Sequence, residues 1–188
     1  MIPPRHFLAA AVAGLLAACS SAVAVVQVEH DVGNMPDLVR YAAGGGALRV
    51  AVHGDPTGGA DAPALAAAVR AAMQGRNGGP ATRFVAAGDP APGAREGWRV
   101  VMVFDRDRPA TLRALCRAPA GDARPGEAVA LRAAFCYRET ALAWVEVAVP
   151  PIPNLDDPLL GRAVSAATRQ LFPPYDPDRS TNGGDVFD

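Results

Sequence analysis

Residues 127–149, EAVALRAAFCYRETALAWVEVAV, predict a β-hairpin and with it the type of fold. Apolar side chains occupy every second position of its first half, which is the period of a strand with one buried face. These positions are Val129, Leu131, Ala133, Phe135 and Tyr137. Residues 138–140 would form the turn and residues 142–149 the returning strand. Cys136 falls on the face opposite Phe135, beside Arg132, where a disulfide could attach a neighbouring strand or loop to the sheet.

Further strands and two helices are predicted on either side of this hairpin. Apolar runs bounded by turn residues indicate strands at 47–53, 82–88 (TRFVAAG), 97–105 (GWRVVMVFD) and 111–117 (TLRALCR). One helix is expected from Asp61 as N-cap to Gly75. The second is expected from Asp157 as N-cap, with Pro158 at its first position, and it ends before Pro173.

These elements predict one α+β domain at residues 45–172, a mostly antiparallel sheet with two packed helices. Residues 19–44 are expected to be a tether that leads into the domain. Residues 173–188 have the composition of a disordered tail. No internal repeat or second change of composition indicates a further domain.

The N-terminal residues 1–18 have the pattern of a signal peptide. Arg5 and the chain's amino group supply positive charge, and residues 7–16 form an apolar run. That run of about ten residues is well short of the roughly 20 needed to span a bilayer. It also lacks the polar positions that a core helix would show, so it predicts a leader that is removed.

The four residues Leu16, Ala17, Ala18 and Cys19 resemble the lipobox of bacterial lipoproteins. This resemblance implies cleavage before Cys19, acylation of that cysteine and, with serine next, the outer membrane. The segment YAAGGGALRV at 41–50 is similar to one in uncharacterised alphaproteobacterial envelope lipoproteins. A competing site lies at residues 22–24, Ala-Val-Ala, where ordinary signal peptidase cleavage would release a soluble periplasmic protein.

Charge and composition exclude nucleic-acid binding as the expected function. All 18 basic residues are arginine. Removing the leader, with its one arginine and no acid, leaves 17 arginines against 19 acidic residues. Because the arginines form no basic block, the sequence indicates no positively charged patch that would bind the phosphates of a nucleic acid.

The remaining cysteines, Cys116 and Cys136, form an even pair in what should be an oxidising compartment. A disulfide between them is the expectation, and two buried thiols are the alternative. A metal site is not expected, because two separated cysteines without a nearby histidine fall short of a four-ligand zinc set. No cofactor is indicated.

Three stretches of the sequence suggest chemistry, and structural roles are the alternative. GDPTGG at 54–59 has the glycine spacing of a phosphate-binding loop, but Ala60 and Asp61 stand where lysine and serine or threonine are needed. Asp105 and Asp107, at the end of an apolar strand, resemble the paired aspartates of haloacid dehalogenase-type phosphatases. The predicted hairpins depart from the α/β fold of that family, which favours a solvated turn.

His53 and Asp55, at the end of a strand, are the third candidate, and a turn or capping role is favoured for them. The sequence does not decide whether Trp98 and Trp144 are buried or form a binding face. Together these observations predict a lipid-anchored envelope protein, a non-enzymatic binding or structural module with a possible envelope protein partner. The alternatives are a small periplasmic, hydrolase-like enzyme using Asp105/Asp107 or His53, and a small-ligand carrier.

Overall fold

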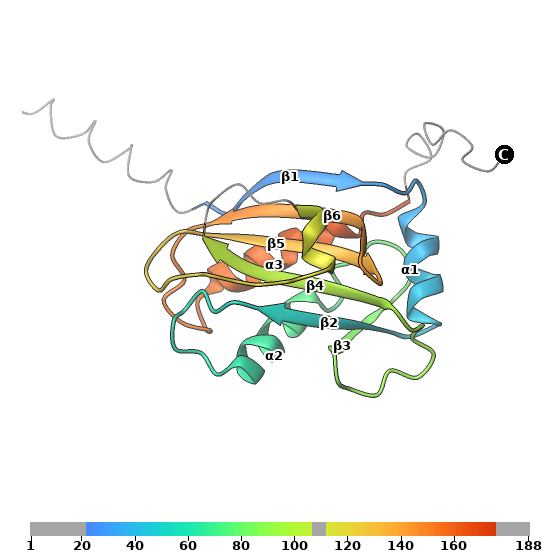
Figure 1. The fold of residues 1–188 in the computed structure, drawn as a ribbon, viewed down its shortest axis with the longest axis horizontal. Helices are drawn as coiled ribbons and strands as arrows, with labels where there is room; N and C mark the ends of the chain where they lie inside the picture. The colour runs from blue at the N-terminus through green and yellow to red at the C-terminus, as the bar shows by residue number, and fades with distance from the viewer. Residues whose placement is uncertain (1–21, 107–111, 176–188) are drawn as a thin grey trace, which may run out of the picture.

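The computed structural model describes residues 22–106 and 112–175, which form one six-stranded mixed sheet with helices packed on it (Figure 1). The strand order is β1-β6-β5-β4-β2-β3. The pairs β1–β6, β6–β5 and β5–β4 are antiparallel, whereas β2 is parallel to both of its neighbours, β4 and β3. The strands are β1 (Ala24–His30), β2 (Ala47–His53), β3 (Arg83–Ala86), β4 (Trp98–Arg106), β5 (Val129–Tyr137) and β6 (Thr140–Val149). The predicted α+β class with a mostly antiparallel sheet is confirmed.

Helices α2 (Ala62–Met73) and α3 (Pro158–Leu171) cover one face of the sheet and pack against each other (Figure 1). The sequence predicts both starts: α3 begins with Pro158 after Asp157, whose side chain accepts a hydrogen bond from the amide of Leu159, and α2 follows Asp61 with Pro63 as its second residue, without a side-chain capping bond. Helix α2 lies against β2 and β3, and α3 lies against β5 and β6. The buried apolar side chains of both helices share one main core with residues of the sheet, among them Phe104, Leu131 and Phe135. The hairpin is confirmed, with Tyr137 pairing Thr140 across its turn.

The predicted tether is wrong for most of its length. Residues 24–30 form β1, which pairs antiparallel with β6 from the Ala24–Ala148 pair onward. Residues 35–43 form helix α1 (Met35–Ala43), whose Val39 and Ala42 are fully buried. Asn34 caps α1 by accepting a hydrogen bond from the amide of Asp37. The domain therefore reaches back at least to residue 24, and its described residues contain three α-helices in place of the two expected.

The predicted strand at 111–117 is also wrong, because its described part forms a 3₁₀ helix, η2 (Leu112–Cys116). The strands that η2 covers, β4, β5 and β6, already have hydrogen-bonded neighbours on both sides. None of these three strands has an open edge, and the segment lies across the sheet face opposite α2 and α3 (Figure 1).

The predicted leader (1–18), Cys19 and most of the predicted tail (173–188) lie outside the described residues. Within the described ranges, none of the helices has the length and apolar character needed to cross a membrane.

Candidate functional site

The sheet face that lies opposite α2 and α3 contains a buried cluster of charged side chains. Arg132, in β5, is only 1% exposed. Its Nη1 donates a hydrogen bond to Asp105 Oδ2 at 2.9 Å, and its Nε donates to Glu146 Oε2 at 2.7 Å. The register explains the meeting, because Arg132 pairs with Glu146 on β6 and with Val103, two residues before Asp105, on β4. We call Asp105, Arg132 and Glu146 the charge cluster.

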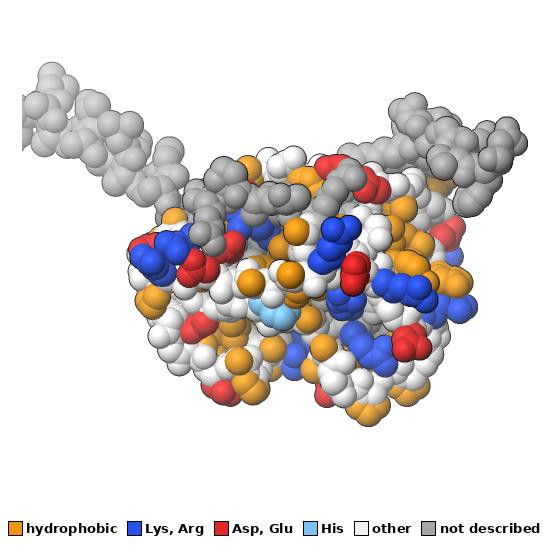
Figure 2. All heavy atoms as spheres, in the orientation of Figure 1, with side chains coloured by type: hydrophobic (Ala, Val, Ile, Leu, Met, Phe, Trp, Pro, Cys, Tyr) orange, Lys and Arg blue, Asp and Glu red, His pale blue; other side chains and the backbone are white. Residues whose placement is uncertain are grey.

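The bonds of the charge cluster indicate a structural role. The other carboxylate oxygen of Asp105, Oδ1, accepts hydrogen bonds from the amides of Arg106 at 2.8 Å and Asp122 at 3.2 Å. Burial of an ion is tolerated where it is paired and hydrogen-bonded, and these contacts meet that requirement. Through the bond from the amide of Asp122, Asp105 ties the loop around Asp122 to the sheet. On the surface of this side of the molecule, basic and acidic side chains are interspersed (Figure 2).

His53 ends β2 on the same face as the charge cluster but makes no hydrogen bond to a described residue. It pairs with Val103, so it lies two residues short of Asp105 along β4. Burial lowers the pKa of the His53 imidazole from 6.5, and the ring is therefore favoured in its neutral form. No hydrogen bond joins His53 to Asp105 within the described residues.

The lowered pKa of His53 predicts that the protein loses stability on acidification. Below pH 6.5 the unfolded chain binds a proton at this site more readily than the folded chain does. The stabilising contribution is therefore present above that pH and is lost as the pH falls through the folded-state pKa. We expect His53→Gln to flatten this part of the stability profile, as measured by urea unfolding over a pH series. An NMR titration placing the His53 pKa at or above 6.5 would contradict this expectation.

Asp55 has the predicted turn role. Its Oδ1 accepts hydrogen bonds from the amide and the hydroxyl of Thr57, both at 2.8 Å, and its Oδ2 accepts from the amide of Ala60 at 3.0 Å. Burial raises the pKa of Asp55, but the hydrogen bonds from Thr57, Gly58 and Ala60 together outweigh that effect and lower it overall. These amides are the groups that a phosphate-binding loop would offer, and here the carboxylate of Asp55 occupies them.

Asp107, the second member of the predicted aspartate pair, lies outside the described residues. Within residues 22–106 and 112–175, no three His, Cys, Asp or Glu side chains are grouped so that they could hold a metal ion. Four surface hollows formed by the described residues are lined by neither His53 nor Asp105.

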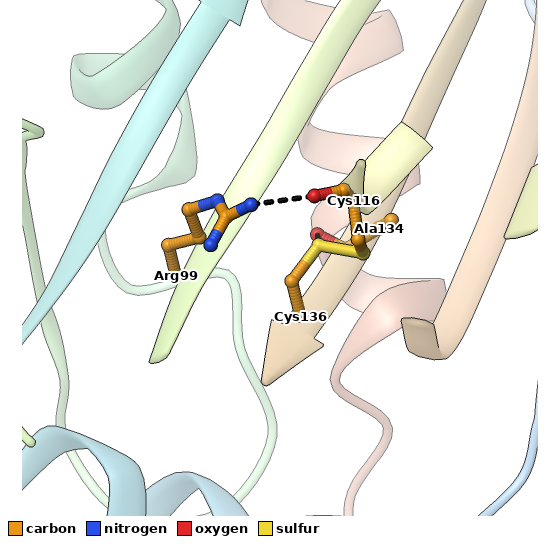
Figure 3. Close-up of a disulfide and its surroundings, with 4 residues drawn as sticks. All are labelled: Arg99, Cys116, Ala134 and Cys136. Atoms are coloured by element: carbon orange, nitrogen blue, oxygen red, sulfur yellow. Dashed lines mark hydrogen bonds between the residues drawn. A yellow bond between two sulfur atoms is a disulfide. The ribbon is translucent and has the colours of Figure 1, made fainter. Parts of the chain in front are cut away.

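The predicted disulfide between Cys116 and Cys136 is present, with a Cα–Cα distance of 5.8 Å. It attaches η2 to β5, as the position of Cys136 on the outer face predicts (Figure 3). Arg99 Nη2 on β4 donates a hydrogen bond to the carbonyl of Cys116 at 2.6 Å, so η2 is held to two strands (Figure 3).

Both tryptophans are buried, and this resolves whether they form a binding face. Trp98 is 9% exposed and packs against Phe135 in the main core, and its ring also contacts the more exposed rings of Tyr41 and Tyr137. Trp144 is 4% exposed and belongs to a second, smaller core under η2 that includes both disulfide cysteines. Neither ring is available as an exposed aromatic patch.

Asp105 is a candidate residue in the sequence, whereas its partners Arg132 and Glu146 were not predicted to meet it. The available signal was one charge inside each apolar strand of the hairpin, in ALRAAF and in AWVEVA. An isolated charge in a strand that is otherwise buried indicates a partner on the adjacent strand.

No known protein family, curated protein or solved structure matches this chain.

Proposed function

We propose that this chain is a lipid-anchored protein of the bacterial cell envelope, attached through Cys19, whose domain acts as a non-enzymatic binding or structural module. The observation that carries the proposal is the disulfide between Cys116 and Cys136. Stable disulfides are typical of oxidising compartments outside the cytosol. Because these two cysteines pair with each other, Cys19 remains for acylation, in the sequence context that resembles a lipobox.

The start of β1 favours cleavage before Cys19 over cleavage after Ala24. Val23 packs against the main core, and Ala24 is the first residue of β1 and pairs with Ala148. A cut after Ala24 would remove both residues from the domain, whereas a cut before Cys19 leaves them in place.

The bonds of the candidate residues argue against the small hydrolase-like enzyme. Asp105 is held by Arg132 and by backbone amides, and Asp55 is held within its own turn. A carboxylate engaged in this way is poorly placed to act as nucleophile or general base. A ligand carrier would use the space between helices and sheet, which buried side chains such as Phe104, Phe135 and Phe172 fill.

Intact mass spectrometry of protein extracted from membranes tests the anchor. We expect a chain that begins at Cys19 and carries two or three acyl chains, because several chains give lasting attachment whereas one is marginal. The matched control, Cys19→Ala, should lack this species. A soluble chain beginning at Val25 would contradict the proposal.

Separation of inner and outer membranes tests the outer-membrane location that Ser20 favours.

Crosslinking in the solubilised envelope, followed by recovery of the lipidated chain, tests whether the domain has an envelope protein partner. Recovery of the same partner with the wild type and its loss with a surface variant that remains folded would support a binding module over a purely structural one.

A further inference from the structure

A hollow of about 700 Å³ lies between α2, α3 and the residues that lead into β1. Small side chains form its floor, and the hydroxyl of Ser165 there donates a hydrogen bond to the carbonyl of Ala72 at 3.2 Å, joining the two helices. Three exposed arginines contribute to its lining: Arg76, Arg162 and Arg169. We call this hollow with its three arginines the arginine groove.

The arginine groove is positive in a chain that is negative overall. Its lining residues include three arginines and no acidic residue, whereas the whole chain has a net charge of −1. None of the three arginines forms an ion pair with an acidic side chain in the described ranges. Arg162 and Arg169 are seven residues apart on α3, so both project from the same side of the helix. The groove therefore offers several cationic groups to one anionic surface.

The arginine groove also lies close to the proposed point of attachment. Ala22 and Val23 line it, and Cys19 is only three residues before Ala22. Even a fully extended chain spans at most about 3.6 Å per residue, so Cys19 lies within roughly 11 Å of Ala22. An acylated Cys19 would therefore hold the edge of the groove close to the bilayer, and charges within the Debye length of the membrane surface, about 10 Å at 0.1 M salt, are only partly screened.

We propose that the arginine groove is the membrane-facing surface of the domain and that it docks on anionic phospholipid head groups. The inference rests on the proposed lipid anchor at Cys19, since the anchor brings this face next to the bilayer. Arginine suits the task because its guanidinium binds phosphate oxygens through two parallel hydrogen bonds. The opposite face, with η2 and the disulfide, then points away from the membrane and toward envelope partners.

Arginine footprinting of the intact lipidated protein tests this orientation. The protein is inserted from detergent into preformed vesicles of phosphatidylcholine, with or without phosphatidylglycerol, so that every domain faces outward. Phenylglyoxal modification is then measured at each arginine by mass spectrometry. We expect Arg76, Arg162 and Arg169 to react about fivefold more slowly on the anionic vesicles, the ratio that corresponds to the usual attraction of one arginine to such a surface. The exposed Arg117 and Arg138, at the other side of the domain, should react equally on both.

Two additional conditions, charge-reversal variants and high salt, test whether the protection comes from electrostatic contact with the membrane. The charge reversal Arg162→Glu/Arg169→Glu should abolish protection of Arg76, whereas Arg117→Glu/Arg138→Glu should leave it unchanged. High salt should also remove the protection, because it shortens the Debye length to about 3 Å at 1 M. Protein that floats with vesicles but shows no protection would overturn the orientation alone. Protein that does not float would overturn the anchor and the orientation together, and equal protection by inorganic phosphate in detergent would indicate a free-anion site instead.

Discussion

Replacing Arg132 with alanine is expected to lower the free energy of unfolding by about 3–5 kcal/mol, the usual cost of breaking a buried ion pair. The side chain of Arg132 donates hydrogen bonds to Asp105 and Glu146, and it is almost completely buried. Its removal leaves two carboxylates near each other with their shared cation gone. Urea unfolding, with the disulfide intact, measures the change.

An exposed pair supplies the matched control. Arg117 Nε lies 4.0 Å from Glu139 Oε2, and both side chains are mostly exposed. We expect Arg117→Ala to change stability by about 1 kcal/mol or less. If Arg132→Ala costs no more than Arg117→Ala, the cluster does not stabilise the fold in the way described.

Removing the disulfide with Cys116→Ala/Cys136→Ala is expected to destabilise the domain by about 3 kcal/mol on the chain-entropy account. The two cysteines are 20 residues apart, and their bond attaches η2 to the sheet over the second core. Because Trp144 belongs to that core, its fluorescence should report the loosening of η2. Chemical denaturation with and without a reducing agent measures the change.

The double variant carries its own control. A reducing agent should destabilise the wild type and leave the double variant unaffected. Thiol labelling of the oxidised mature protein should find neither Cys116 nor Cys136 reactive. Rapid labelling of both in non-reducing conditions would refute the disulfide in the cell.

Most of the local structure could be predicted because it depends on short-range patterns. A continuous apolar run indicates the strand at 97–105 and alternation of apolar residues indicates the hairpin, and both occur there. The aspartate and proline pairs at 61–63 and 157–158 predict where α2 and α3 begin. Asp55 binds its own loop, as a turn residue should.

The errors concern segments whose structure depends on distant partners. The predicted tether contains β1, which forms only because β6, more than 100 residues later, offers it an open edge. The predicted strand at 111–117 forms η2, since the edges of the strands beneath it are already occupied. Neither the open edge nor the occupied ones can be recognised from the segment itself.

The candidate site divides in the same way. Asp105 was recognised from its position after an apolar strand, but its role depends on Arg132 and Glu146, which reach it only through the register of three strands. The arginines of the arginine groove come from separate parts of the sequence and gather only when α2 packs on α3.

The sequence by itself determined the α+β class, the hairpin, the helix starts and the pairing of Cys116 with Cys136. Periodicity and capping depend only on residues close together in the chain, and the pairing follows because two cysteines remain once Cys19 is set aside. It also supplies the lipobox-like residues on which the anchor proposal depends. Only the tertiary structure decided that β1 and α1 belong to the domain, that η2 covers one sheet face, and that buried charges meet beneath it. Those outcomes depend on which edges and faces remain available after the sheet has assembled, and long-range hydrogen bonding and burial set that availability.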